Sequence, residues 1–129
     1  MNEPVWVSRR ALLLLHAESL AGFGGSSGMR DEGLFESALE RARMRWNYQP
    51  ESSIPELAAC YGFGLAKNHA MFDGNKRLGF LAIGVFLRVN GYRLAADRAE
   101  AVLVMEDVAA GRLGEQELAA WLQTHVVAG

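Results

Sequence analysis

Hydrophobic positions recur at helical spacing along nearly the whole chain, and glycine and proline interrupt them at a few points. After Pro4, the segment VWVSRRALLLLHAESLA predicts a first helix. Its apolar side chains recur at roughly helical intervals, at Val5, Leu12, Leu15 and Leu20. The stretch GFGGSSG at 22–28 is too rich in glycine and serine for regular structure. We therefore expect a loop there.

A second helix is predicted over 29–46, with Arg30 or Asp31 near its N-terminus. The residues expected to face the core are Leu34, Ala38, Ala42 and Met44. The residues expected to face water are Glu36, Glu40, Arg41 and Arg45.

Two helices in the middle of the chain are apolar on almost every face. Ser53 is a predicted cap for the first, PELAACYGFGLAKNH, with Pro55 in the first turn and Glu56 three residues after the cap. The second, NKRLGFLAIGVFLRVNGY, ends at Asn90-Gly91. Helices without a wide polar face belong at the centre of a bundle.

The chain closes with two amphipathic helices, DRAEAVLVMEDVAAG and GEQELAAWLQTHV. No segment predicts a convincing strand, and GYRLAA at 91–96 favours a short extended stretch at most. The sequence therefore predicts an all-α bundle of about six helices, with residues 1–129 forming a single domain.

Composition narrows the class of protein. Half of the residues are hydrophobic and 22% are charged, which is typical of a globular chain. A net charge of −2 argues against a broad nucleic-acid-binding face, so we expect no direct DNA binding. The single cysteine, Cys60, lies in an apolar run and is expected to be buried rather than reactive. No signal peptide and no apolar stretch of membrane-spanning length is evident, so we expect a cytoplasmic protein without membrane contact.

The nine residues HAMFDGNKR at 69–77 join the two most apolar helices and carry the candidate chemistry. Gly74 permits a sharp turn, and Asp73 or Asn75 is a candidate cap for the next helix. The first N–H groups of that helix lack helical partners and form an anion site together with the helix dipole. Two cations, Lys76 and Arg77, lie in this first turn, where the dipole alone favours acidic residues.

Two further side chains complete a set suited to group transfer. His69 is a candidate general base for a hydroxyl, because histidine titrates near neutral pH. Asp73 is a candidate ligand for Mg²⁺ shared with phosphate oxygens. These parts are typical of phosphoryl or nucleotidyl transfer.

A purely structural interpretation stays open for single residues. D-G-N is a frequent turn, and a basic pair is often simply solvated. His16 faces a leucine-rich stripe and is interpreted as a packed structural histidine, and His125 as a solvated one. Without a cluster of cysteine and histidine, a zinc site is not expected.

At these residues the sequence resembles the Fic/Doc (Fido) superfamily, whose motif is H-x-F-x-(D/E)-(G/A)-N-x-R. Lys76 matches the death-on-curing (Doc) branch of type II toxins, in which N-K-R replaces the N-G-R of Fic enzymes. The segments GMRDEGLFESAL, ELAACYGFGLAKNH and FLRVNGYRL also resemble those that flank the motif. The resemblance covers roughly residues 11–94.

The resemblance implies a role for each matching residue. His69 is the implied general base for a Ser or Thr hydroxyl, and Asp73 the implied Mg²⁺ ligand. The implied nucleotide- and phosphate-binding residues are Gly74, Asn75, Lys76 and Arg77. A Doc-type activity implies phosphoryl transfer from Mg-ATP to a protein such as elongation factor Tu. This modification of the target inhibits translation. The alternatives are AMP transfer as in Fic enzymes, and a catalytically inactive homologue that binds nucleotide or antitoxin.

Three departures from the family pattern matter. Met71 stands where the motif has phenylalanine, and we expect it to fill the same apolar space. Residues 22–28 correspond to the flap that aligns the target chain, but Gly22 replaces an arginine found there in Doc, and Arg30 is a candidate substitute. The family's inhibitory helix motif is not matched, because Ser52 and Glu56 are followed by Leu57. Restraint is therefore expected from a separate antitoxin whose C-terminal segment folds onto this chain.

Overall fold

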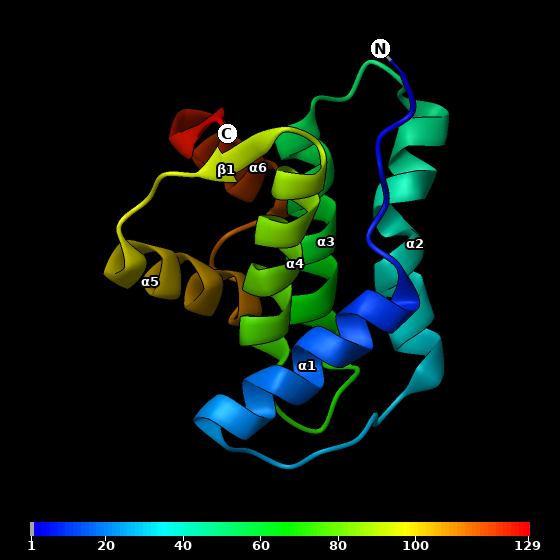
Figure 1. The fold of residues 1–129 in the computed structure, drawn as a ribbon, viewed down its shortest axis with the longest axis vertical. Helices are drawn as coiled ribbons and strands as arrows, with labels where there is room; N and C mark the ends of the chain where they lie inside the picture. The colour runs from blue at the N-terminus through cyan, green and yellow to red at the C-terminus, as the bar shows by residue number, and fades with distance from the viewer. Residues whose placement is uncertain (1) are drawn as a thin grey trace.

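The computed structural model describes residues 2–129 and contains six helices and one small sheet (Figure 1). The helices are α1 Arg9–Phe23, α2 Glu32–Tyr48, α3 Ile54–Asn68, α4 Asn75–Val89, α5 Arg98–Ala109 and α6 Glu115–His125. Strand β1, Tyr92–Leu94, pairs antiparallel with β2, Val126–Ala128. The prediction of an all-α bundle of about six helices is confirmed.

Helix α3 lies at the centre and packs against α2, α4 and α6. Its start is the predicted capping box, in which the Ser53 hydroxyl accepts from the Glu56 N–H and Glu56 accepts from the Ser53 N–H at 2.8 Å. This backbone hydrogen bond is the main reason why the pKa of Glu56 lies below its usual value. Cys60 is fully buried, as predicted, and burial raises its pKa to about 11, so the thiol stays protonated at neutral pH.

Two glycines allow α3 and α4 to pack closely along their length (Figure 1). A Cβ at Gly79 would lie 2.9 Å from the carbonyl oxygen of Gly62 and 3.1 Å from Cε of Met105. A Cβ at Gly62 would lie 2.3 Å from Cδ1 of Ile83. The helix pair that holds the motif loop therefore depends on the absence of side chains at both positions.

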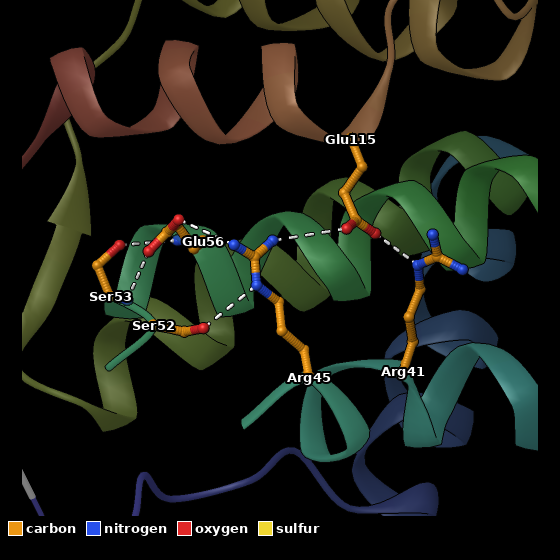
Figure 2. Close-up of polar contacts among 6 residues, drawn as sticks. All are labelled: Arg41, Arg45, Ser52, Ser53, Glu56 and Glu115. Carbon is orange, nitrogen blue, oxygen red and sulfur yellow. Dashed lines mark hydrogen bonds and ion pairs between the residues drawn. The ribbon is translucent and has the colours of Figure 1, made fainter. Parts of the chain in front are cut away.

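A charged network joins α2, α3 and α6 on the side of α3 shown in Figure 2. The Arg45 guanidinium donates to Glu56 at 2.9 Å and to the Ser52 hydroxyl at 3.2 Å, and it lies 3.6 Å from Glu115. Glu115 also accepts a hydrogen bond from Arg41. The prediction that Arg45 simply faces water is wrong, because three elements meet around its guanidinium.

The first helix begins later than the sequence predicts. Residues 5–7 lie outside any helix, Ser8 caps α1, and Val5 is 56% exposed rather than part of the apolar stripe. The reason is a side-chain clamp. The amide of Asn90 accepts from the Val5 N–H at 2.8 Å and donates to the Val5 carbonyl at 2.9 Å, which holds the backbone out of a helix.

Two smaller predictions also fail. Met44 is 53% exposed, because the buried stripe of α2 runs through Phe35, Ala38 and Ala42 instead. The chain end leaves the helical conformation after His125, since residues 126–128 pair with β1. The extended stretch expected in GYRLAA is present as β1. Among the described residues, no helix is long and apolar enough to cross a membrane.

We expect Gly79→Ala to destabilise the fold by about 1–3 kcal/mol, because the new methyl group overlaps the α3 backbone. Gly84→Ala is the matched control on the same helix, since a Cβ there meets nothing within 4 Å. The control is expected to be neutral or to gain up to about 1 kcal/mol of helix propensity. Urea unfolding of both variants measures the difference. Equal stability of the two variants would contradict this account of the packing.

Candidate functional site

The loop between α3 and α4 is fixed by two left-handed backbone positions. His69 ends α3 with φ 51° and ψ 45°, and Gly74 precedes α4 with φ 77°. Among the described residues, His69 is the only non-glycine with positive φ, a conformation common at helix C-termini. Between them Met71 is 2% exposed, so the prediction that methionine fills the core position of the motif is confirmed.

Asn75 closes the loop with its side chain. Its Oδ1 accepts from the Met71 N–H at 3.0 Å, and its Nδ2 donates to the Met71 carbonyl at 3.1 Å. The prediction that Asp73 or Asn75 caps α4 is wrong, because the N-cap residue is Gly74 and no side chain accepts from the first turn. The amide of Asn75 is engaged with the loop instead.

The first turn of α4 is therefore open. Leu78 is the first residue whose N–H donates to the backbone, to the Gly74 carbonyl at 2.9 Å. Within residues 2–129, no acceptor is found for the N–H groups of Asn75, Lys76 and Arg77. Such groups, with the positive end of the helix dipole, bind anions.

Asp73 is held by three hydrogen bonds. Its carboxylate accepts from the Gly74 N–H at 2.9 Å and from the Ser26 N–H at 3.3 Å. Its backbone carbonyl lies 2.7 Å from Nε2 of His16. His16 is 5% exposed, so the prediction of a packed histidine is confirmed, but its ring contacts the motif loop through this hydrogen bond.

The flap, residues 22–28, runs alongside the motif loop (Figure 1). The prediction of a loop over the whole stretch is wrong for residues 22 and 23, because α1 continues through Phe23 and ends at its C-cap, Gly24. A backbone bridge pairs Met29 with Met71, and the Phe72 N–H donates to the Gly28 carbonyl at 3.2 Å. The flap also receives a hydrogen bond from Arg77, whose guanidinium donates to the Gly24 carbonyl at 3.1 Å. Flap and loop are thus one hydrogen-bonded unit.

Arg30 does not replace the arginine that is missing from the flap. Its guanidinium donates to the His69 carbonyl at 2.8 Å and reaches the Asn68 carbonyl at 3.5 Å. Its positive charge therefore compensates the partial negative charge of the carbonyl groups at the C-terminal end of α3. Arg30 does not line the cavity that the motif residues share.

One cavity of about 770 Å³ is lined by all six residues singled out from the sequence. They are His69, Asp73, Gly74, Asn75, Lys76 and Arg77. The rest of the wall is largely apolar and comes from α1, α4, α5 and Phe72 of the motif loop. Phe23, Phe80 and Val102 are examples from the three helices. The Arg77 guanidinium lies over the Phe23 ring, 5.1 Å from its centre, so cationic and apolar side chains of this wall contact each other.

Sequence reasoning missed three polar residues of this cavity: Ser19, Arg98 and Glu106. The Ser19 hydroxyl is buried, and no hydrogen-bond partner is found for it in the described part of the chain. Arg98 adds a third cation to the wall and Glu106 a second carboxylate. The amphipathic pattern of α5 predicts that one face of the helix packs inward. Because any packed helix has such a pattern, it does not identify Arg98 and Glu106 as residues of a cavity.

The described residues contain no cluster of three or more histidine, cysteine or acidic side chains that could hold a metal ion. Asp73 is the carboxylate of the motif loop, next to the open first turn of α4, and a carboxylate oxygen has further lone pairs after accepting one N–H. This donor set fits Mg²⁺ shared with phosphate oxygens better than a resident transition metal.

We expect Gly25→Ala to separate the flap from the loop. Gly25 has φ +122°, and a Cβ there would lie 2.9 Å from Oδ2 of Asp73, so the Ser26 contact must break. Gly22→Ala is the matched control, since a Cβ at that position meets nothing within 4 Å. Amide hydrogen exchange at Ser26 and Phe72 should accelerate in the first variant and not in the second. Unchanged exchange in both would refute the coupling.

Comparison with known proteins agrees with the geometry. The model of the Fic/DOC family matches residues 6–87, which include α1, the flap, the motif loop and most of α4. A protein named Toxin Doc from Mycolicibacterium smegmatis is 40% identical over 85 residues. That alignment spans 65% of this chain and 65% of the relative, just under two thirds of its length. The chain belongs to the Fic/Doc family.

Proposed function

We propose that this chain is a Doc-like toxin that transfers a phosphoryl group from Mg-ATP to a Ser or Thr hydroxyl of a protein. The observation that carries the proposal is the shared cavity wall. His69, the two cations Lys76 and Arg77, and the helix start at Asn75 with its unpaired N–H groups all line one cavity of about 770 Å³. Volumes of this size are typical of sites for small molecules.

The cations of the cavity wall suit a polyphosphate. The three free N–H groups of the first α4 turn point out along the helix axis, and Lys76 and Arg77 add two formal charges beside them. Cations at a helix N-terminus are unfavourable by themselves, so an anion that bridges them and the amides compensates for their placement. Arg98 of α5 lines the same cavity and adds a third positive charge to its wall.

The apolar side chains of the cavity wall suit a planar heterocycle. Phe23, Phe80 and Val102 offer apolar surface for the faces of a base beside the cations that bind phosphate. A nucleotide therefore fits the cavity better than free phosphate does.

Asp73 is the proposed metal ligand, because its carboxylate supplies oxygen atoms, the donor type that Mg²⁺ prefers. When bound there, Mg²⁺ neutralises phosphate charge that develops during transfer. The hydrogen bonds from Gly74 and Ser26 hold the carboxylate in place before any nucleotide arrives.

His69 is the proposed general base. Its side chain is exposed at the cavity wall, and its backbone position is fixed by Arg30 through the 2.8 Å contact to the carbonyl. In the proposed step the imidazole accepts the proton of the target hydroxyl, and the hydroxyl oxygen bonds to the γ-phosphorus. The bond from that phosphorus to the β–γ bridging oxygen breaks, and ADP leaves.

Lys76 is the reason for favouring phosphoryl over AMP transfer. Lys76 lines the cavity at a position where Fic enzymes have a small residue. In our proposal its side chain takes up space that a phosphate would otherwise use, which leaves the γ-phosphate facing the hydroxyl. AMP transfer is the second candidate. A homologue that only binds nucleotide or antitoxin is the third, and the presence of both His69 and Asp73 on the cavity wall speaks against it.

The proposal includes partners and location. A relative is named a toxin, which supports restraint of this chain by a cognate antitoxin whose C-terminal segment folds onto it. Elongation factor Tu is the proposed protein target, in the cytoplasm, with inhibition of translation and growth as the result. Direct DNA contact by this chain is not part of the proposal, since its net charge is −2.

The test uses the purified chain, elongation factor Tu or a bacterial lysate, and ATP labelled at either the α- or the γ-phosphate. We expect γ-label on protein with the wild type and none with His69→Ala, which should still bind nucleotide because the anion site is intact. His125→Ala is the control, since His125 packs against Trp121 and does not line the cavity.

Each outcome of the labelling experiment favours one of the three candidate functions. Protein labelled from the α-phosphate favours AMP transfer, and no label from either position favours a binding protein. Transfer that persists in His69→Ala rules out this base. Expression of the wild type should arrest growth unless the antitoxin is present, whereas expression of His69→Ala should not.

A further inference from the structure

His16 is the only buried histidine of the described chain, and the proposed chemistry does not use it. It comes from the middle of α1, far from the motif in sequence, and is 5% exposed. Its Nε2 lies 2.7 Å from the carbonyl oxygen of Asp73. Because a carbonyl oxygen only accepts, Nε2 must carry the hydrogen.

The ring also lies close to Gly74. A Cβ at Gly74 would be 3.5 Å from Nε2 of His16 and 3.4 Å from Nη2 of Arg77. The imidazole and the guanidinium therefore both lie on the side of Gly74 toward which a side chain would project. A side chain at this position would meet the imidazole that is hydrogen-bonded to Asp73.

The hydrogen bond from His16 controls the orientation of one peptide group. The Asp73–Gly74 peptide is trans, so its C=O and N–H point in opposite directions. The C=O accepts from His16 at 2.7 Å, and the N–H donates to Oδ1 of Asp73 at 2.9 Å. A rotation of this peptide would break both contacts together, and the carboxylate would lose the N–H that holds it.

We propose that His16 is a positioning residue, which orients the Asp73 carboxylate for a divalent cation by fixing the Asp73–Gly74 peptide. The role toward the metal rests on the proposed function, whereas the role toward the peptide does not. A ligand that is oriented by buried hydrogen bonds binds metal more tightly, by about 10- to 100-fold in comparable sites.

Two variants separate the hydrogen bond from the volume of the ring. His16→Phe keeps a planar ring and removes the donor, while His16→Gln keeps an N–H at a similar reach. The first readout is hydrogen exchange of the Gly74 amide, with the buried Leu87 amide as internal reference. We expect faster exchange at Gly74 relative to Leu87 in His16→Phe, and protection close to wild type in His16→Gln.

The second readout is the affinity for a non-hydrolysable ATP analogue with and without Mg²⁺. We expect His16→Phe to bind the analogue normally without Mg²⁺ and to lose about tenfold or more of the gain that Mg²⁺ gives to the wild type. His16→Gln should retain that gain. A merely structural role would instead lower binding equally in both conditions.

The outcomes distinguish this inference from the proposed function. If the wild type gains nothing from Mg²⁺, the metal role of Asp73 fails, and with it the metal role of His16. The Gly74 exchange data then still decide whether His16 fixes the peptide. If Gly74 exchange is the same in wild type and His16→Phe, or if His16→Gln behaves like His16→Phe, the inference is overturned.

A measurement on the wild type covers the case in which His16→Phe fails to fold. Nitrogen-15 NMR of the His16 ring is expected to show a protonated Nε2 when the ring is neutral. Protonation at Nδ1 alone would overturn the inference, because that form cannot donate to Asp73.

Discussion

Helix α4 begins without any side chain that satisfies its first turn, and the candidate site depends on this open end. The free N–H groups of residues 75–77 carry partial positive charge, and Lys76 and Arg77 place full charges next to them. In a helix that served packing alone, an N-cap side chain would remove this unfavourable combination. The side chains that are able to cap are engaged elsewhere: Asn75 with Met71, and Asp73 with Gly74 and Ser26.

The surrounding structure keeps the open turn in place. Close contact of α3 and α4 at Gly62 and Gly79 fixes the distance between the two ends of the loop. The buried Met71 anchors the loop in the core, and the flap is joined to the loop by the hydrogen bond from the Phe72 N–H to the Gly28 carbonyl and by the adjacent Met29–Met71 bridge. Preorganisation of this kind lets binding groups act without a cost for ordering them.

Much of the fold follows from local sequence rules, because capping boxes and apolar periodicity act within one turn or one helix. Ser53 and Glu56 mark the start of α3, and the all-round apolar pattern predicts its central position. The errors arise where distant segments meet. Asn90 hydrogen-bonds to the backbone of Val5, which stays outside α1. Arg45 pairs with Glu56 and Glu115 and is only partly exposed. No local pattern encodes such pairs.

The same distinction applies to the site. The six motif residues are contiguous or nearly so, and their side-chain chemistry alone selects them as candidates. Their gathering on one cavity wall is an outcome of the fold, and the α5 wall with Arg98 and Glu106 is visible only there. His16 is the clearest case. A histidine on a leucine-rich helix predicts burial, but its contact with the Asp73 carbonyl depends on where α1 crosses the loop.

The most direct test of the open helix end is an amide NMR titration with a non-hydrolysable ATP analogue. If triphosphate binds where the account places it, the N–H signals of Asn75, Lys76 and Arg77 will shift most, downfield, and together. Saturating shifts that are confined to other segments, or no shift at these amides, would contradict the claim that this turn is built to bind phosphate.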